Sequence, residues 1–416
     1  MNAKFTAVDC PVYEETFPVE DRCSLKKCSH YGIRGSVFGG NVQAEHPIDT
    51  AAETNTPPGE GRYNSYDLLR IFSAISVIII HVNAHFFGSR AGAPSSSLYY
   101  VAESLLNIVT RFSVPAFIMI SGAFILGNPA NRDYLYFYRK SSYKIFLPTF
   151  AVIIIFFILS EMKWITTYHN PLPPLYALLI GGQYNLWFMY LLFGLYALVP
   201  FIIRLKEVTE KRVYKIVAYF MLFWSVVSQM TSTYALPYSI GVVFAFLSYF
   251  IIGNVLYEES NTQNKSSRAA MWFCAAIACF LITFFSRYAR LTNDLFDPYT
   301  SFFSPTITLA SICIFIGFGK LKINWHCEKL SSLTFFMYLF HTPIYGVQFR
   351  FRKLLPSNEL LAIAAVVILT VLMSLGAAIL FTKLWYYCES RWNWKKHWYH
   401  WRIWQKQLDN STLKDT

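Results

Sequence analysis

Long apolar segments recur along the chain, each about 20 residues long and separated from the next by short polar stretches. An α-helix of that length crosses about 30 Å of hydrocarbon. The segments do not alternate polar and apolar positions as membrane barrel strands do. The pattern predicts an all-α integral membrane protein, a bundle of about ten transmembrane helices. The predicted spans are 67–87, 100–126, 144–160, 184–203, 213–231, 236–256, 270–286, 301–319, 331–349 and 360–384.

Polar segments flank this transmembrane region, predicted as residues 63–387. Residues 1–62 carry no long apolar run and are expected to be a disordered cytoplasmic arm. Residues 388–416 alternate tryptophans with lysines and arginines, as in WNWKKHWYHWRIWQK. Aromatic and basic residues after a last span suit a lipid headgroup surface, so we expect membrane lipids as partners of this tail; a specific partner site is the alternative. Residues 172–182 are too short to span and are expected to be re-entrant or a loop helix.

Composition excludes a soluble protein. Of 416 residues, 55% are hydrophobic and 14% are charged, and the mean hydropathy is +0.35. The net charge of +12 comes mainly from short loops between spans, so we expect no nucleic acid partner. The eight cysteines show no zinc-site spacing, and we predict neither a disulfide nor a metal.

The basic loop residues also predict the orientation. The richer set is Arg132, Arg139, Lys140, Lys144, Arg204, Lys206, Lys211, Arg212, Lys215, Lys265, Arg268, Lys320, Lys322 and Lys329. The poorer set is Arg90, Lys163, Arg287, Arg290, Arg350, Arg352 and Lys353. Placing the richer set inside makes both termini cytoplasmic.

A strong base and an imidazole share the first predicted span. Arg70 and His81 are eleven positions apart, or about three helical turns, so both side chains point to the same side about 16 Å apart. Ionisable groups inside a membrane are candidates for function. A purely structural role stays open for Arg70, because its side chain can extend to the membrane surface or pair with Asp67. A metal pair of His81 and His85 would lack further ligands.

Arg111 in the second span is a further buried base. If the chain enters this span from outside, Arg111 lies at a depth similar to that of His81. Near it, Pro115 is expected to loosen the helix. Arg111 is therefore either an interfacial arginine beside an ordinary proline kink or an anion-stabilising donor facing a polar cavity shared with His81.

Two further places hold candidate residues. Trp187 and Tyr190 lie where the fourth span begins, with Gln183, Tyr184 and Asn185 before them, and form either an aromatic membrane belt or a platform for a sugar. His341 lies in the ninth span just before Pro343. It either bonds backbone carbonyls freed by the proline or faces the cavity.

Six motifs follow one another along the chain: Arg70–x10–His81, RFSVPAFIMISG, YRKSSYKIFLPTF, NLWFMYLLFGLYALVPFI, SPTITLASICIFIGFG and SLTFFMYLFHTPI. In these motifs the chain resembles the acyltransferase-3 family of integral membrane acyltransferases, particularly the stand-alone O-acetyltransferases of bacterial surface polysaccharides. The resemblance covers about residues 64–386 and leaves out the arm and the tail.

The resemblance implies an O-acyltransferase in the inner (cell) membrane. It implies transfer of an acyl group, expected to be acetyl, from acyl-CoA to a hydroxyl of a cell-surface polysaccharide or lipid-linked sugar. Acetyl-CoA is then a donor substrate, and no tightly bound cofactor is expected. A multi-span transporter of a small molecule or glycan precursor is the alternative.

The chemistry assigns roles to the candidates. Acylation of an alcohol needs a base for the hydroxyl proton and a donor for the developing oxyanion. We hypothesise that His81 is the base, with an acyl-histidine intermediate as a variant, and that Arg111 stabilises the charge. Arg70 would bind phosphate groups of the CoA. His341 and Tyr338 would orient His81 or the acceptor.

Overall fold

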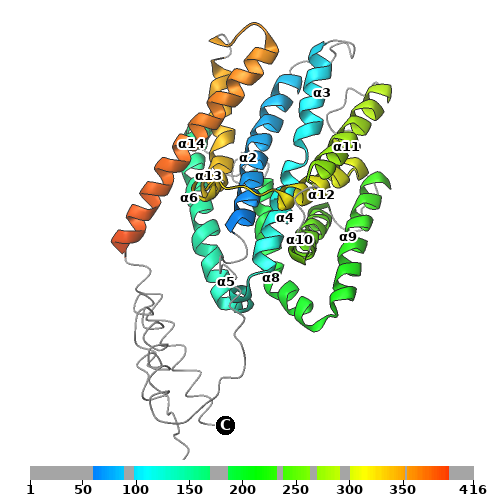
Figure 1. Cartoon of the computed structure of the whole chain (residues 1–416). Helices are drawn as coiled ribbons and strands as arrows, with labels where there is room; N and C mark the ends of the chain where they lie inside the picture. Colours follow the sequence, from blue (N-terminus) through cyan, green and yellow to red (C-terminus); the bar gives the residue numbers. More distant parts are fainter. Residues whose placement is uncertain are drawn as a thin grey trace, which may run out of the picture. The chain divides into compact units, whose positions relative to one another are not determined.

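The computed structural model describes residues 60–88, 98–168, 186–231, 238–262, 269–290, 300–351 and 354–392. All regular structure in these ranges is helical (Figure 1). The predictions for most of the arm, for 172–182 and for most of the tail lie outside the described residues. The elements are α2 (Glu60–Gly88), α3 (Leu98–Thr110), α4 (Ser113–Leu126), η5 (Pro129–Arg132), α5 (Tyr134–Ser141), the π-helical turn η6 (Ser142–Phe146), α6 (Leu147–Tyr168), α8 (Trp187–Val208), α9 (Lys211–Thr231), α10 (Tyr238–Thr262), α11 (Ala269–Arg290), α12 (Pro305–Lys320), α13 (Glu328–Arg350) and α14 (Glu359–Trp392).

Eight helical segments in the described ranges are long and apolar enough to cross a membrane. The remaining two predicted spans also lie on helices, which differ in length or polarity from the other eight. The apolar helix α12 has 16 residues, and α13 has 23 residues but carries more polar side chains. The protein is therefore all-helical in its described part and has the helices of a multi-pass membrane protein. The number of about ten spans and the cytoplasmic termini stay predictions.

The second predicted span is broken into two helices. α3 ends at Thr110 and α4 begins at Ser113, so Arg111 lies in the break. The cause is Pro115, which has no N–H to donate to the carbonyl of Arg111 four residues earlier. Hydrogen bonding resumes with the Ala116 N–H, which donates to the carbonyl of Phe112 at 2.9 Å. The proline thus separates two helices and places Arg111 at the break.

Helix α2 lies among other helices, and its residues Ser65, Ser73, Ser76 and Asn83 are buried, whereas His85 is exposed. It packs against α3, α4, α12, α13 and α14, and Figure 1 shows α2 with α13 and α14 on one side and α3 on the other. Tyr66, Leu69 and Ser73 on this helix are fully buried. The first span is therefore a central element and can present Arg70 and His81 to its neighbours.

Helices α4 and α10 pack with their backbones in close contact. Two glycines face each other's backbones: a Cβ on Gly122 would lie 1.7 Å from the carbonyl oxygen of Phe250, and a Cβ on Gly253 would lie 2.1 Å from that of Met119. Small residues let helices in a membrane approach until their backbones touch. This contact fixes α4, and with it the break that holds Arg111.

Ion pairs join the helix ends at one side of the bundle. Lys206 pairs with Glu258, and Lys215 Nζ lies 2.8 Å from Glu259 Oε1. Arg132 Nε lies 2.7 Å from Glu207 Oε1. The three basic residues all belong to the richer loop set, so these members of the set share one end of the fold.

Candidate active site

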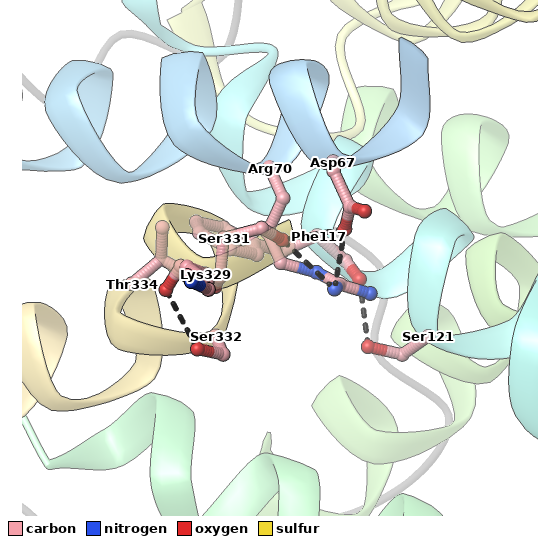
Figure 2. A network of polar contacts seen from close by, with 8 residues as sticks. All are labelled: Asp67, Arg70, Phe117, Ser121, Lys329, Ser331, Ser332 and Thr334. Atoms are coloured by element: carbon pink, nitrogen blue, oxygen red, sulfur yellow. Dashed lines mark hydrogen bonds and ion pairs between the residues drawn. The ribbon is translucent and has the colours of Figure 1, made fainter. Parts of the chain in front are cut away.

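Arg70 is held by a small polar network (Figure 2). Its Nη1 donates to Asp67 Oδ1 at 3.3 Å and to Ser331 Oγ at 3.1 Å. The Ser331 hydroxyl donates to the same Asp67 oxygen at 2.6 Å. The guanidinium carbon lies 6.0 Å from the Phe124 ring centre. Residues of α2, α4 and α13 therefore contact Arg70.

The pairing of Arg70 with Asp67 leaves donor capacity unused. Both hydrogen bonds come from Nη1, and within the described residues Nε and Nη2 donate none. The side chain keeps 30% of its surface exposed. Figure 2 shows the guanidinium pointing from α2 toward Ser121 and Phe117 of α4. Arg70 therefore pairs with Asp67, as one interpretation of the sequence expected. This pairing does not use all the hydrogen-bond donors of the guanidinium.

His81 faces the other histidine of the candidate set. The ring centres of His81 and His341 are 5.2 Å apart. Arg70 contacts Ser331 and His81 contacts His341, so both α2 residues face α13, and the two helices run in the same direction at this contact. The prediction that Arg70 and His81 share one side of the first span is confirmed.

The sequence left two interpretations open for His341, and the structure contradicts the first in one respect. This side chain is fully buried, and its Nδ1 bonds the backbone carbonyl of Tyr338. Because a carbonyl only accepts, Nδ1 carries the hydrogen, and Nε2 accepts from the Thr342 hydroxyl at 3.2 Å. The carbonyl is not that of Leu339, which Pro343 leaves without its helical donor. His341 therefore bonds the backbone and also faces His81.

Arg111 follows α3, the helix that packs against α2 beside His81. Its Nε donates to Asn107 Oδ1 at 2.8 Å, and its guanidinium carbon lies 5.4 Å from the Phe302 ring centre. On α3, the backbone carbonyl of Glu103 accepts from Asn83 Nδ2, and Asn83 lies two residues after His81. The structure therefore brings His81 and His341 together and places the helix that leads to Arg111 beside them, although the sequence puts these residues in three different spans.

The three aromatic candidates lie in different surroundings. The Trp187 ring stacks on Phe302, with centres 6.2 Å apart, and so continues the surface on which Arg111 rests. The Tyr338 ring lies 5.3 Å from that of His341. The Tyr190 ring packs against Phe193 at 6.3 Å, a contact that does not link it to the imidazole pair. Gln183, Tyr184 and Asn185 lie outside the described residues.

Two buried ionisable residues near this group, Arg287 and Glu103, were not predicted from the sequence as candidates. Arg287, which the sequence reading assigned to an outer loop, lies in α11 with 1% of its surface exposed and interacts electrostatically with Arg111. The loop assignment is wrong because α11 continues to Arg290. Glu103 on α3 is 2% exposed, and its backbone carbonyl accepts from Asn83 Nδ2 at 2.9 Å.

One sequence signal could have found the second of these residues. Glu103, Asn107 and Arg111 recur every four positions, which gives one polar stripe that runs along α3 and continues to Arg111 just after it, inside an otherwise apolar span. Asn107 is 3% exposed.

As for metals, within the described ranges no three His, Cys, Asp or Glu side chains are grouped as ligands.

Comparison with known proteins identifies the family. Residues 63–382 match the acyltransferase-3 family, whose description is "Acyltransferase domain". The match covers most of the chain, and the protein belongs to this family of membrane acyltransferases. No curated protein and no solved structure matches the chain.

Proposed function

We propose that the protein is a membrane O-acyltransferase. It transfers an acyl group, which we expect to be acetyl, from acyl-CoA to a hydroxyl of a cell-surface polysaccharide or lipid-linked sugar. We propose that the enzyme lies in the inner membrane and binds acyl-CoA from the cytoplasmic side. Membership of the acyltransferase-3 family supports acyl transfer, and the donor and acceptor are part of the proposal.

The observation that carries the proposal is the pairing of His81 with His341 beside Arg111. An imidazole inside the bundle can remove the proton of an attacking hydroxyl, and a neighbouring guanidinium can stabilise the oxygen that becomes negative. The 5.2 Å ring contact gives His81 a defined neighbour, and Tyr338 packs behind His341. Trp187 offers an aromatic face for the acceptor sugar.

Arg70 suits the donor end of the same stripe. It stands about 16 Å along α2 from His81, which allows an extended thioester arm to reach from one residue to the other. Its unused N–H groups on Nε and Nη2 can bind a phosphate oxygen pair in bidentate fashion. Asp67 and Ser331 then hold the guanidinium in position.

Labelled acetyl-CoA supplied to inverted membrane vesicles tests the proposal. We expect label to appear in a glycan fraction, and surface glycans to lose one acyl mass when the gene is deleted. Failure of every acyl-CoA tested to label a glycan or lipid-linked sugar would contradict the proposal. A transporter would leave the acetyl-CoA unconsumed.

The change Arg70→Gln should weaken binding of the donor. Loss of charged hydrogen bonds worth about 1.5–3 kcal/mol raises the KM for acyl-CoA about 10–100-fold. Initial rates over a range of donor concentrations give KM. The control is Arg204→Gln, which removes an arginine that is 69% exposed and pairs with Glu207. Equal effects of the two changes would show that Arg70 acts only through general charge.

A further inference from the structure

Asn107 carries a hydrogen-bond donor that the family match and the sequence leave without a role. Its side chain is 3% exposed, and its Oδ1 accepts from Arg111 Nε at 2.8 Å. Arginine has no acceptor, so the amide oxygen must face it, and the amide orientation is fixed. The other atom, Nδ2, is buried and has no hydrogen-bond partner among the described residues. An unpaired buried donor is unfavourable, so the arrangement favours a partner that the described residues do not supply.

The position of this donor relates it to the acyl-transfer site. Asn107 lies one helical turn before Arg111, on the stripe that begins at Glu103. The contacts of Arg111 within the described residues include the neutral amide of Asn107 and the ring of Phe302, and no carboxylate pairs with it. On the same helix, the backbone carbonyl of Glu103, one turn before Asn107, accepts from Asn83 Nδ2, and Asn83 lies two residues after His81 on α2. A fixed amide donor and a guanidinium without a carboxylate partner therefore lie side by side along the helix that packs against α2 beside the proposed base.

We propose that Asn107 Nδ2 is a second donor, beside Arg111, to the oxygen that becomes negative during acyl transfer. This inference rests on the proposed function. The acceptor hydroxyl oxygen bonds to the thioester carbonyl carbon while its proton passes to His81, and the carbonyl π electrons move onto the oxygen. Arg111 and Asn107 bind that oxygen. The carbonyl then re-forms, the C–S bond breaks, and the thiolate takes the proton from His81.

Asn83 provides a matched comparison. It is also an asparagine inside the bundle, with 1% of its surface exposed. Its Nδ2 already donates to the Glu103 carbonyl, so the atom without a partner is Oδ1, an acceptor. An oxyanion needs donors, and Asn83 lacks the wholly unpaired Nδ2 that Asn107 has. The two residues differ in the property that the proposal uses.

The test compares kcat and KM in full-length protein in vesicles. Asn107→Leu removes the amide at nearly constant volume, and Asn107→Asp keeps an oxygen for Arg111 Nε but has no hydrogen to donate when ionised. Both changes should lower kcat for acetyl transfer about 10²–10³-fold, the usual cost of one oxyanion donor. The KM for acetyl-CoA should stay within about threefold, since the interaction forms only in the transition state. Asn83→Leu should lower the melting temperature but leave kcat largely unchanged.

The outcomes separate this inference from the proposed function. Wild-type protein that transfers no acyl group overturns the proposed function and this role of Asn107 with it. An active wild type together with an Asn107→Asp variant of unchanged kcat overturns the role of Asn107 alone, because holding Arg111 would then suffice. Loss of kcat in both Asn107 variants, with normal protein abundance and melting temperature, supports it.

Discussion

Replacing His81 by glutamine should lower the rate of acyl transfer about 10²–10⁴-fold, the range contributed by a positioned general base. Glutamine keeps a polar side chain of similar size but cannot accept the acceptor proton at neutral pH. The contact with His341 is a ring contact at 5.2 Å, so the change should leave helix packing largely intact. Release of CoA from acetyl-CoA in the presence of acceptor, normalised to protein abundance in the membrane, measures the effect.

His85→Gln is the matched control for this experiment. His85 lies one helical turn further along α2, is exposed, and packs its ring against Phe349 with centres 3.8 Å apart. It should retain most of the activity, because its position is too far along α2 to replace His81 beside Arg111. Turnover by His81→Gln at the rate of His85→Gln would remove His81 from the mechanism.

The sequence was sufficient for features set by local periodicity. The eleven-residue spacing of Arg70 and His81 corresponds to about three turns, so their common direction follows from helix geometry alone. The same reasoning places ten apolar segments on helices, because hydrocarbon leaves the backbone no other partner. The sequence predicted that Pro115 loosens the second span. In the structure the span is broken into two helices, α3 and α4.

Features that depend on neighbouring helices could not be predicted in this way. Nothing in the sequence says that α2 and α13 lie side by side, so the link from His81 to His341 needed the structure. Arg287 looked like a loop residue because its burial comes from packing in the bundle and not from its own segment.

The glycine contact between α4 and α10 should be the most sensitive packing site in the described fold. Gly122→Ala places a methyl group 1.7 Å from a backbone oxygen, and backbone cannot move aside as a flexible side chain can. The cost should reach at least about 3 kcal/mol, the upper part of the range for overpacking. The melting temperature of the purified protein in detergent should therefore fall by at least roughly 4 °C. Activity should fall as well, since α4 carries the chain directly after Arg111.

Gly376→Ala in α14 separates this steric effect from the general effect of replacing a helical glycine. A Cβ on Gly376 meets nothing within 4 Å, so only helix propensity changes, which favours alanine by about 1 kcal/mol. Its melting temperature should stay the same or rise by a few degrees. Gly253→Ala, on the opposite side of the α4–α10 contact, should resemble Gly122→Ala because its Cβ would lie 2.1 Å from the Met119 carbonyl oxygen. Melting temperatures that are equal for Gly122→Ala and Gly376→Ala would mean that α4 and α10 are not in backbone contact. The position of Arg111 relative to His81 would then lose its structural support.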